Sequence, residues 1–110
     1  IKAFAERIFK MEMSEENIVL SIFKAIDEVN KMLPEERRLQ KLTDTFLAGD
    51  RGKLESLELI NFIVELEGRL QKDFGLTFNL IEWLEIPDES MKRISGLAKF
   101  IKAQANREEQ

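Results

Sequence analysis

One long amphipathic segment, residues 56–73, constrains the fold of this chain more than any other feature. Its apolar residues recur at the i, i+3, i+4 and i+7 spacing of a helix, and its charged and amide residues fall largely on the other side. Gly75 follows, where a glycine can end a helix in a left-handed conformation. We therefore expect a long helix with a broad apolar face, made of Leu57, Ile60, Ile63, Val64, Leu66 and Leu70 and extended by Leu59 and Phe62.

A similar pattern predicts a second main helix near the start of the chain. Ser14 is a suitable N-cap, and Glu15 and Glu16 place negative charge in the first turn, where the helix dipole favours it. Pro34 cannot continue a helix, so this one should end near Leu33. The apolar stripe of this predicted helix is Ile18, Ile22, Ala25, Ile26, Val29 and Leu33.

The rest of the chain predicts shorter elements and a closing helix. Ser95 has the character of an N-cap for that last main helix. A short helix is expected from Asn79, with Trp83 buried or half-buried. Residues 34–55 show no sustained period, so we expect a loop whose apolar residues form a short helix or fill the core, with a turn at the glycines of 49–52.

These elements predict an all-α fold, a small bundle of three main helices with additional short helices. We expect residues 1–13 to form a separate amphipathic extension, with apolar residues at helical spacing, and residues 14–110 to form the main domain. A chain of 110 residues is long enough for one such domain. No apolar run is long enough to span a membrane. The apolar positions of the extension are Ile1, Phe4, Ala5, Ile8 and Phe9.

Composition excludes several kinds of chemistry. The chain has no Cys and no His, so it offers no thiolate, no imidazole base and no Cys- or His-ligated metal. The formal net charge is −4, which disfavours nucleic-acid binding, because phosphate binding requires a clustered positive surface. We expect no metal site and no catalytic residue, and any thioester chemistry must use a sulfur that is attached to the chain.

Ser56 is the residue that invites a chemical interpretation. It precedes the long helix, so it can act as an ordinary N-cap. It can also be an acceptor of a phosphate ester, because a helix N-terminus offers unpaired N–H groups and partial positive charge. No His is available to activate its hydroxyl as a nucleophile.

The residues around Ser56 resemble the attachment motif of the acyl carrier proteins. Glu55-Ser56-Leu57 corresponds to the family's common Asp-Ser-Leu, and an apolar run that ends in Leu66-Glu67 follows it. The resemblance extends over roughly residues 15–103, through Gly52-Lys53-Leu54, the segment 74–80 and the closing segment 94–101. It is similar to atypical stand-alone bacterial carriers.

This resemblance implies a fold of acyl-carrier type, with residues 14–110 as the carrier domain, and a specific function. A phosphopantetheinyl transferase would move 4′-phosphopantetheine from coenzyme A to Ser56, and the thiol of that arm would carry acyl or aminoacyl groups as thioesters. Acyl-loading and acyl-processing enzymes of lipid or secondary-metabolite biosynthesis would be the partners. Glu55 and Leu57 would be motif neighbours, and partner enzymes would dock on Glu58, Ile60 and Glu65.

Two other hypotheses remain open at this point. The chain can be an unmodified helical interaction module with the same fold, as the extension of residues 1–13 and Trp83 suggest. It can also be an enzyme that uses a carboxylate pair such as Glu55 and Glu58, although no raised pKa is indicated by the sequence. We expect the protein to be a monomer in the cytoplasm.

Overall fold

Helices make up the architecture of residues 12–108, which are the residues that the computed structural model describes. Within this range the only β-type pairing is an isolated bridge between Phe46 and Arg93, so the all-α prediction is confirmed here. The expected extension helix falls almost entirely on residues 1–11, which lie outside the described range. The elements are α2 (Glu15–Asn30), η1 (Glu35–Arg37), α3 (Ser56–Phe74), α4 (Ile81–Leu84), η2 (Glu89–Lys92) and α5 (Ile94–Glu108).

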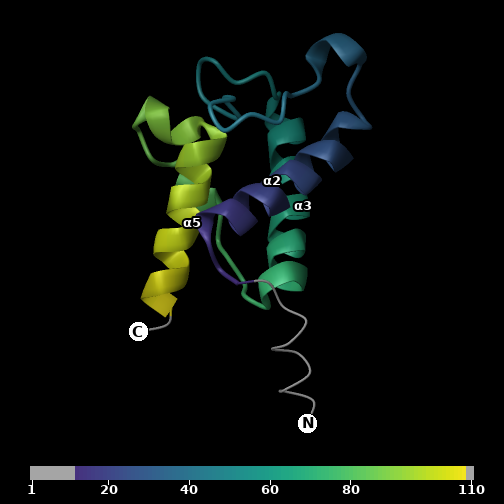
Figure 1. Ribbon diagram of the computed structural model, residues 1–110. Coiled ribbons are helices and arrows are strands. Elements are labelled where there is room, and N and C mark those ends of the chain that lie inside the picture. Colours follow the sequence, from purple (N-terminus) through teal and green to yellow (C-terminus); the bar gives the residue numbers. More distant parts are fainter. Residues whose placement is uncertain (1–11, 109–110) are drawn as a thin grey trace.

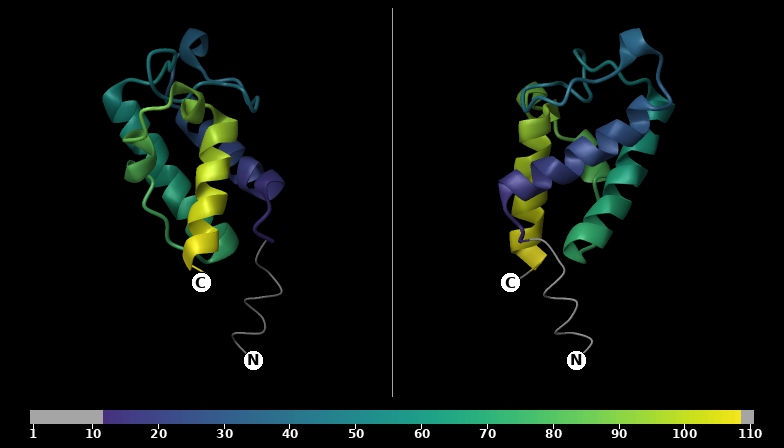
Figure 2. Two further views of the ribbon diagram at one scale, coloured as in Figure 1. Left: turned by 90° about the vertical axis from the view of Figure 1, so that its left-hand side faces the viewer. Right: turned by 45° about the vertical axis from the view of Figure 1, so that its right-hand side comes forward.

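Helices α3 and α5 stand on opposite sides of the molecule, and α2 crosses diagonally between them (Figures 1 and 2). Helix α2 packs against both of the others, and α4 and η2 lie on the connection from α3 to α5. The loop from α2 to α3 passes over one end of this arrangement. No helix in residues 12–108 has the length and apolar character needed to cross a membrane.

Helix α2 begins as predicted. The Ser14 hydroxyl accepts a hydrogen bond from the Asn17 N–H at 3.1 Å, and the predicted apolar stripe is buried. The helix ends at Asn30 rather than near Leu33. The side chain of Asn30 pairs with both main-chain groups of Leu39, accepting from its N–H at 2.9 Å and donating to its carbonyl at 3.0 Å. This pairing turns the chain away from the helix axis, and Leu33 is buried from the turn that follows.

Helix α3 ends as predicted, and Gly75 takes the left-handed conformation with φ 73°. Its buried face differs from the predicted one, because the apolar residues of this helix outnumber the positions that α2 and the rest of the core can cover. Leu57, Ile60 and Val64, which the sequence placed on the core face, are 72%, 41% and 63% exposed. The buried residues of α3 are Phe62, Ile63, Leu66, Leu70 and Phe74.

The prediction that Ser95 caps the closing helix is wrong. Helix α5 begins at Ile94, and Ser95 lies inside its first turn. Two N–H groups at this helix start donate to main-chain carbonyls of the long loop instead. Ile94 N–H donates to Thr45 O at 2.9 Å, and Ser95 N–H donates to Thr43 O at 2.8 Å. In return, Leu47 N–H donates to Lys92 O at 2.8 Å.

The long loop therefore contributes to the core, as one of the two sequence predictions for it proposed. Leu39 and Leu47 are buried, whereas Leu42 is 53% exposed. The Phe46 ring lies against the guanidinium of Arg93, 4.7 Å from the ring centroid. The predicted turn at residues 49–52 is present, and Gly49 adopts a positive φ of 79° there.

Trp83 of α4 is fully buried, as the sequence predicted. Its indole N–H donates to the carbonyl of Met91 at 2.6 Å, which satisfies the one polar group of the ring. Lys92 is also buried, and its ammonium donates to the carbonyls of Trp83 and Leu84 at the end of α4. Burial lowers the pKa of the Lys92 ammonium. These contacts join α4 to the segment that leads into α5.

Candidate functional site

Ser56 is exposed at the first residue of α3, directly after the long loop. The sequence predicted that Ser56 is the N-cap, the last residue before the helix. That prediction is wrong, because Glu55 occupies the N-cap with extended backbone (φ −75°, ψ 164°) and Ser56 is the first helical residue. A position at the start of the helix still leaves Ser56 beside N–H groups that have no partner within the helix. The hydroxyl is therefore on the surface at the positive end of a helix of 19 residues.

The turn that carries Ser56 is held by Glu58. The carboxylate of Glu58 accepts a hydrogen bond from the Glu55 N–H at 2.9 Å, the arrangement of a capping box. The same carboxylate pairs with the guanidinium of Arg37 in η1, whose Nη1 donates to Glu58 Oε2 at 2.9 Å. Arg37 also donates to the carbonyl of Lys53 at 3.2 Å. One side chain of the loop thus contacts both sides of the Ser56 turn.

Charge near Ser56 is mixed. The hydrogen bond from Arg37 lowers the pKa of the Glu58 carboxyl, and the same bond raises the pKa of the Arg37 guanidinium. The Glu58 side chain is 24% exposed and already has these partners, whereas that of Glu55 is 76% exposed and lies 3.9 Å from Arg37. Of the two carboxylates beside Ser56, Glu55 is therefore the one that presents charge to solvent.

Apolar residues lie exposed along the outer side of α3. Leu57, Ile60 and Val64 are spaced by three and four residues, so they form one stripe, here named the outer stripe. At the end of this stripe, near the middle of α3, Val64 and the partly exposed Glu65 line a hollow of about 390 Å³ together with residues of the second half of α2. Met32, which is 73% exposed, borders this hollow and adds to its apolar surface.

The structure places the predicted site residues along the first three turns of α3. Ser56, Glu55 and Leu57 are exposed at the helix start, and Ile60 and Glu65 follow along the helix. Sequence reasoning missed Arg37 and Met32. Nothing in the sequence signals the pairing of Arg37 with Glu58, 21 residues away. Met32 lies two residues before Pro34, which was expected to end the helix, and it is not part of the predicted apolar stripe. Its position outside that stripe was the feature of the sequence that could have indicated its exposure to solvent.

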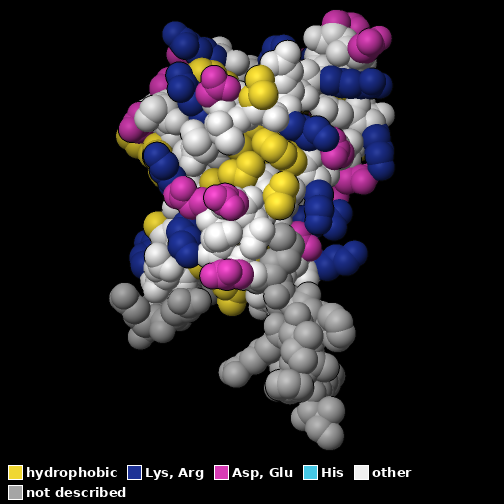
Figure 3. All heavy atoms as spheres, in the orientation of Figure 1, with side chains coloured by type: hydrophobic (Ala, Val, Ile, Leu, Met, Phe, Trp, Pro, Cys, Tyr) yellow, Lys and Arg dark blue, Asp and Glu magenta, His cyan; other side chains and the backbone are white. Residues whose placement is uncertain are grey.

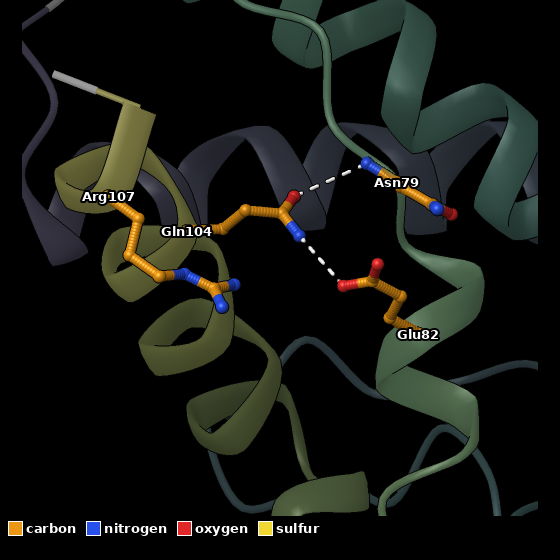
Figure 4. Close-up of a pocket in the computed structure, with 4 residues that line it drawn as sticks. All are labelled: Asn79, Glu82, Gln104 and Arg107. Atoms are coloured by element: carbon orange, nitrogen blue, oxygen red, sulfur yellow. Dashed lines mark hydrogen bonds between the residues drawn. The ribbon is translucent and has the colours of Figure 1, made fainter. Parts of the chain in front are cut away.

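A second, polar hollow lies between α4 and α5 (Figure 4). Gln104 projects across it, accepting from the Asn79 N–H at 3.2 Å and donating to Glu82 at 3.4 Å. Arg107 completes the lining. Because Gln104 is buried and its amide is used by these two partners, we interpret this hollow as a connection between α4 and α5.

Nowhere in residues 12–108 do three potential metal-ligating side chains gather into a group that could hold an ion.

Comparison of the chain with models of protein families, with curated proteins and with solved structures finds no match in any of the three.

Proposed function

We propose that this chain is a carrier protein of the acyl-carrier type, modified on Ser56 by 4′-phosphopantetheine. The observation that carries this proposal is the exposed hydroxyl of Ser56 at the start of α3, on a turn held by Glu58 and Arg37. A visiting enzyme can reach this position. A phosphodiester on the Ser56 oxygen would lie beside the positive end of the helix, where an anion is stabilised.

The modification would be a phosphoryl-type transfer carried out by a separate enzyme. The Ser56 oxygen would form a bond to the phosphorus that carries pantetheine, and the pyrophosphate bond of coenzyme A would break. Adenosine 3′,5′-bisphosphate would leave, and the serine proton would pass to a base of the transferase. The product would end in a thiol, which supplies the sulfur that this Cys-free chain lacks.

The geometry favours a carrier over an enzyme that uses Glu55 and Glu58. A general acid of this kind needs a raised pKa, whereas the pKa of Glu58 is lowered by its pairing with Arg37. The Glu55 side chain is largely in solvent. No His in the chain can serve as a base. A role as acceptor asks only that the Ser56 hydroxyl be reachable.

The outer stripe is the surface that we propose for partner enzymes. Leu57 lies next to the attachment residue and Val64 lies two turns further along the helix, so a partner that approaches the arm would meet both. Glu55 and Glu65 would add charge at its edges, which raises the rate of encounter more than the affinity. Glu58 would not contact the partner directly but would hold the helix start in place, through its hydrogen bond from the Glu55 N–H and its ion pair with Arg37.

The test is the mass of the protein after incubation with coenzyme A and a transferase of broad specificity. We expect the intact mass to increase by one phosphopantetheine group, and fragmentation to place that group on Ser56. Ser56→Ala should abolish the increase. Ser90→Ala, which changes an exposed serine of η2, is the matched control and should gain the full mass.

Two outcomes would refute the proposal. One is an unchanged mass of folded wild-type protein under conditions in which a known carrier is fully modified. The other is a mass increase that persists in Ser56→Ala. Circular dichroism of each variant shows whether the helical fold is intact, so that a failure to react can be separated from a failure to fold.

A further inference from the structure

Three cationic side chains, Arg51, Lys53 and Arg93, lie near the ring of Phe46 on the long loop, and these four residues are here named the Phe46 cluster. The guanidinium carbon of Arg93 lies 4.7 Å from the ring centroid, and that of Arg51 lies 5.5 Å from it. Both are within the range of cation–π attraction. Lys53 lines a hollow of about 150 Å³ together with Arg51 and Phe46.

The local backbone explains why Phe46 and Arg93 face each other. They form an isolated antiparallel bridge, and the main-chain hydrogen bonds are made by the residues on either side of them. Such a non-hydrogen-bonded pair has its side chains close together on one side of the bridge. Leu47 and Ile94 are fully buried, so the alternation of side chains places Phe46 and Arg93 on the outer side.

The three cations of the Phe46 cluster keep their capacity to bind an anion. No carboxylate described in residues 12–107 forms an ion pair with any of them, and the Nε of Arg93 is buried without a hydrogen-bond partner in that range. Charge over the upper end of the molecule, where the long loop passes, is mixed (Figure 3). Asp44, Asp50 and Glu89 belong to the same segments, and the Glu89 carboxylate accepts from the Asp50 N–H at 2.8 Å.

The spacing of these cations suits an acidic peptide segment. Because both distances are measured from one ring centre, the guanidinium carbons of Arg51 and Arg93 are at most about 10 Å apart. In an extended segment, side chains on one side recur every 7 Å or so, which lets two acidic residues reach both. Each guanidinium can hold a carboxylate through two parallel hydrogen bonds. Leu39 and Phe46 give the hollow an apolar lining, which suits a peptide better than a free anion.

We propose that the Phe46 cluster binds an acidic segment of a partner protein. Carboxylates of that segment would pair with Arg51 and Arg93, and Lys53 would add a third contact. Lys53 lies three residues before Ser56, so a partner held here would lie beside the Ser56 turn. The inference goes beyond the modification of Ser56 and does not depend on it, because the cluster contains none of the residues assigned to that site.

Nuclear magnetic resonance titration of the unmodified full chain tests this inference. The probe is a pentapeptide with blocked ends, Asp-Phe-Asp-Leu-Asp, and the matched neutral peptide has Asn in place of each Asp. We expect the acidic peptide to cause saturable shifts of the amide signals of Phe46, Arg51 and Arg93 at millimolar concentration, and the neutral peptide to cause none. Binding should weaken strongly in about 1 M salt, where charges are screened beyond about 3 Å.

Exposed positions provide the variants. Arg51 and Lys53 are exposed, so their replacement should leave the helical fold intact, which circular dichroism checks. Arg51→Gln and Lys53→Gln should each weaken peptide binding about threefold. Arg51→Lys, which keeps the charge but loses the bidentate geometry, should lose less than Arg51→Gln. Lys24→Gln, at an exposed lysine of α2, is the matched control and should bind like the wild type.

Three results would overturn the proposal. The first is the absence of saturable shifts with the acidic peptide at low salt. The second is an equal response to the neutral peptide. The third is unchanged binding in both Arg51→Gln and Lys53→Gln. Inorganic phosphate serves as a further probe, and tighter binding of phosphate than of the peptide would identify a simple anion site instead. None of these measurements involves coenzyme A or a transferase, so their outcome is separate from that of the Ser56 test.

Discussion

The guanidinium of Arg37 pairs with the carboxylate of Glu58 and thereby connects η1 to the first turn of α3. The two residues are 21 positions apart, and the loop between them ends at Ser56. Because Glu58 also accepts from the Glu55 N–H, one carboxylate caps the helix and holds the loop. Loss of its charge should therefore affect the helix start and the loop together.

We expect Glu58→Gln to lower the melting temperature at neutral pH, and the deficit to shrink in acid. Pairing lowers the pKa of Glu58 in the folded protein. The folded state then binds fewer protons than the unfolded state, so this contribution is complete above the ordinary glutamate pKa of about 4.3 and disappears as the pH falls through the lower, folded pKa. Thermal unfolding of both proteins from pH 7 downwards measures the difference.

Glu85→Gln is the control for this pH series, since Glu85 is exposed and follows the short helix α4. Its melting temperature should track that of the wild type at every pH. A Glu58→Gln deficit that is the same at pH 7 and below the glutamate pKa would show that the charge of Glu58 contributes nothing.

Replacement by alanine should change the stability of the protein in opposite directions at two glycines of the α3 region. Gly68 is an exposed position inside α3, and an added Cβ would meet nothing within 4 Å, so Gly68→Ala should stabilise the protein by about 0.5–1 kcal/mol. Gly75 has a φ of 73°, so Gly75→Ala should destabilise it by about 1–2 kcal/mol. Denaturant midpoints measure both, and equal signs would contradict the assigned conformations.

Leucines on the two sides of α3 should differ strongly when truncated. Leu66 is fully buried, so Leu66→Ala should cost about 2–5 kcal/mol through lost burial and the cavity left behind. Leu57 is 72% exposed, so Leu57→Ala should change the stability by about 0.5 kcal/mol or less. Chemical unfolding of the two variants makes the comparison. A large loss in Leu57→Ala would place that residue in the core and remove it from the outer stripe.

The helices could be predicted from the sequence where a local signal decides the outcome. Ser14 and Gly75 act as cap and stop because their own side chain or backbone makes the needed conformation favourable. Trp83 was expected to be buried or half-buried as a large aromatic residue, and it is fully buried. These predictions depend on residues within a few positions of one another.

The errors arise where distant segments meet. Ser95 is not a cap because carbonyls of Thr43 and Thr45 already serve the start of α5. Leu57 and Val64 fit the helical period, but the core does not extend far enough around α3 to cover them. Periodicity shows which residues share a face and cannot show how wide the covered part is. The position of Ser56 at the helix start was predictable, and the contact of its turn with Arg37 was not.

The middle of the long loop is fastened to the end of η2 and the start of α5 by three main-chain hydrogen bonds, between Thr43 and Ser95, Thr45 and Ile94, and Leu47 and Lys92. The connection from α2 to α3 therefore acts as two short spans separated by a fixed point. Arg37 also ties the span that follows α2 to Lys53 and Glu58, so an inserted or deleted residue between Leu47 and Lys53 would have to be absorbed within that short stretch to leave the start of α3 in place.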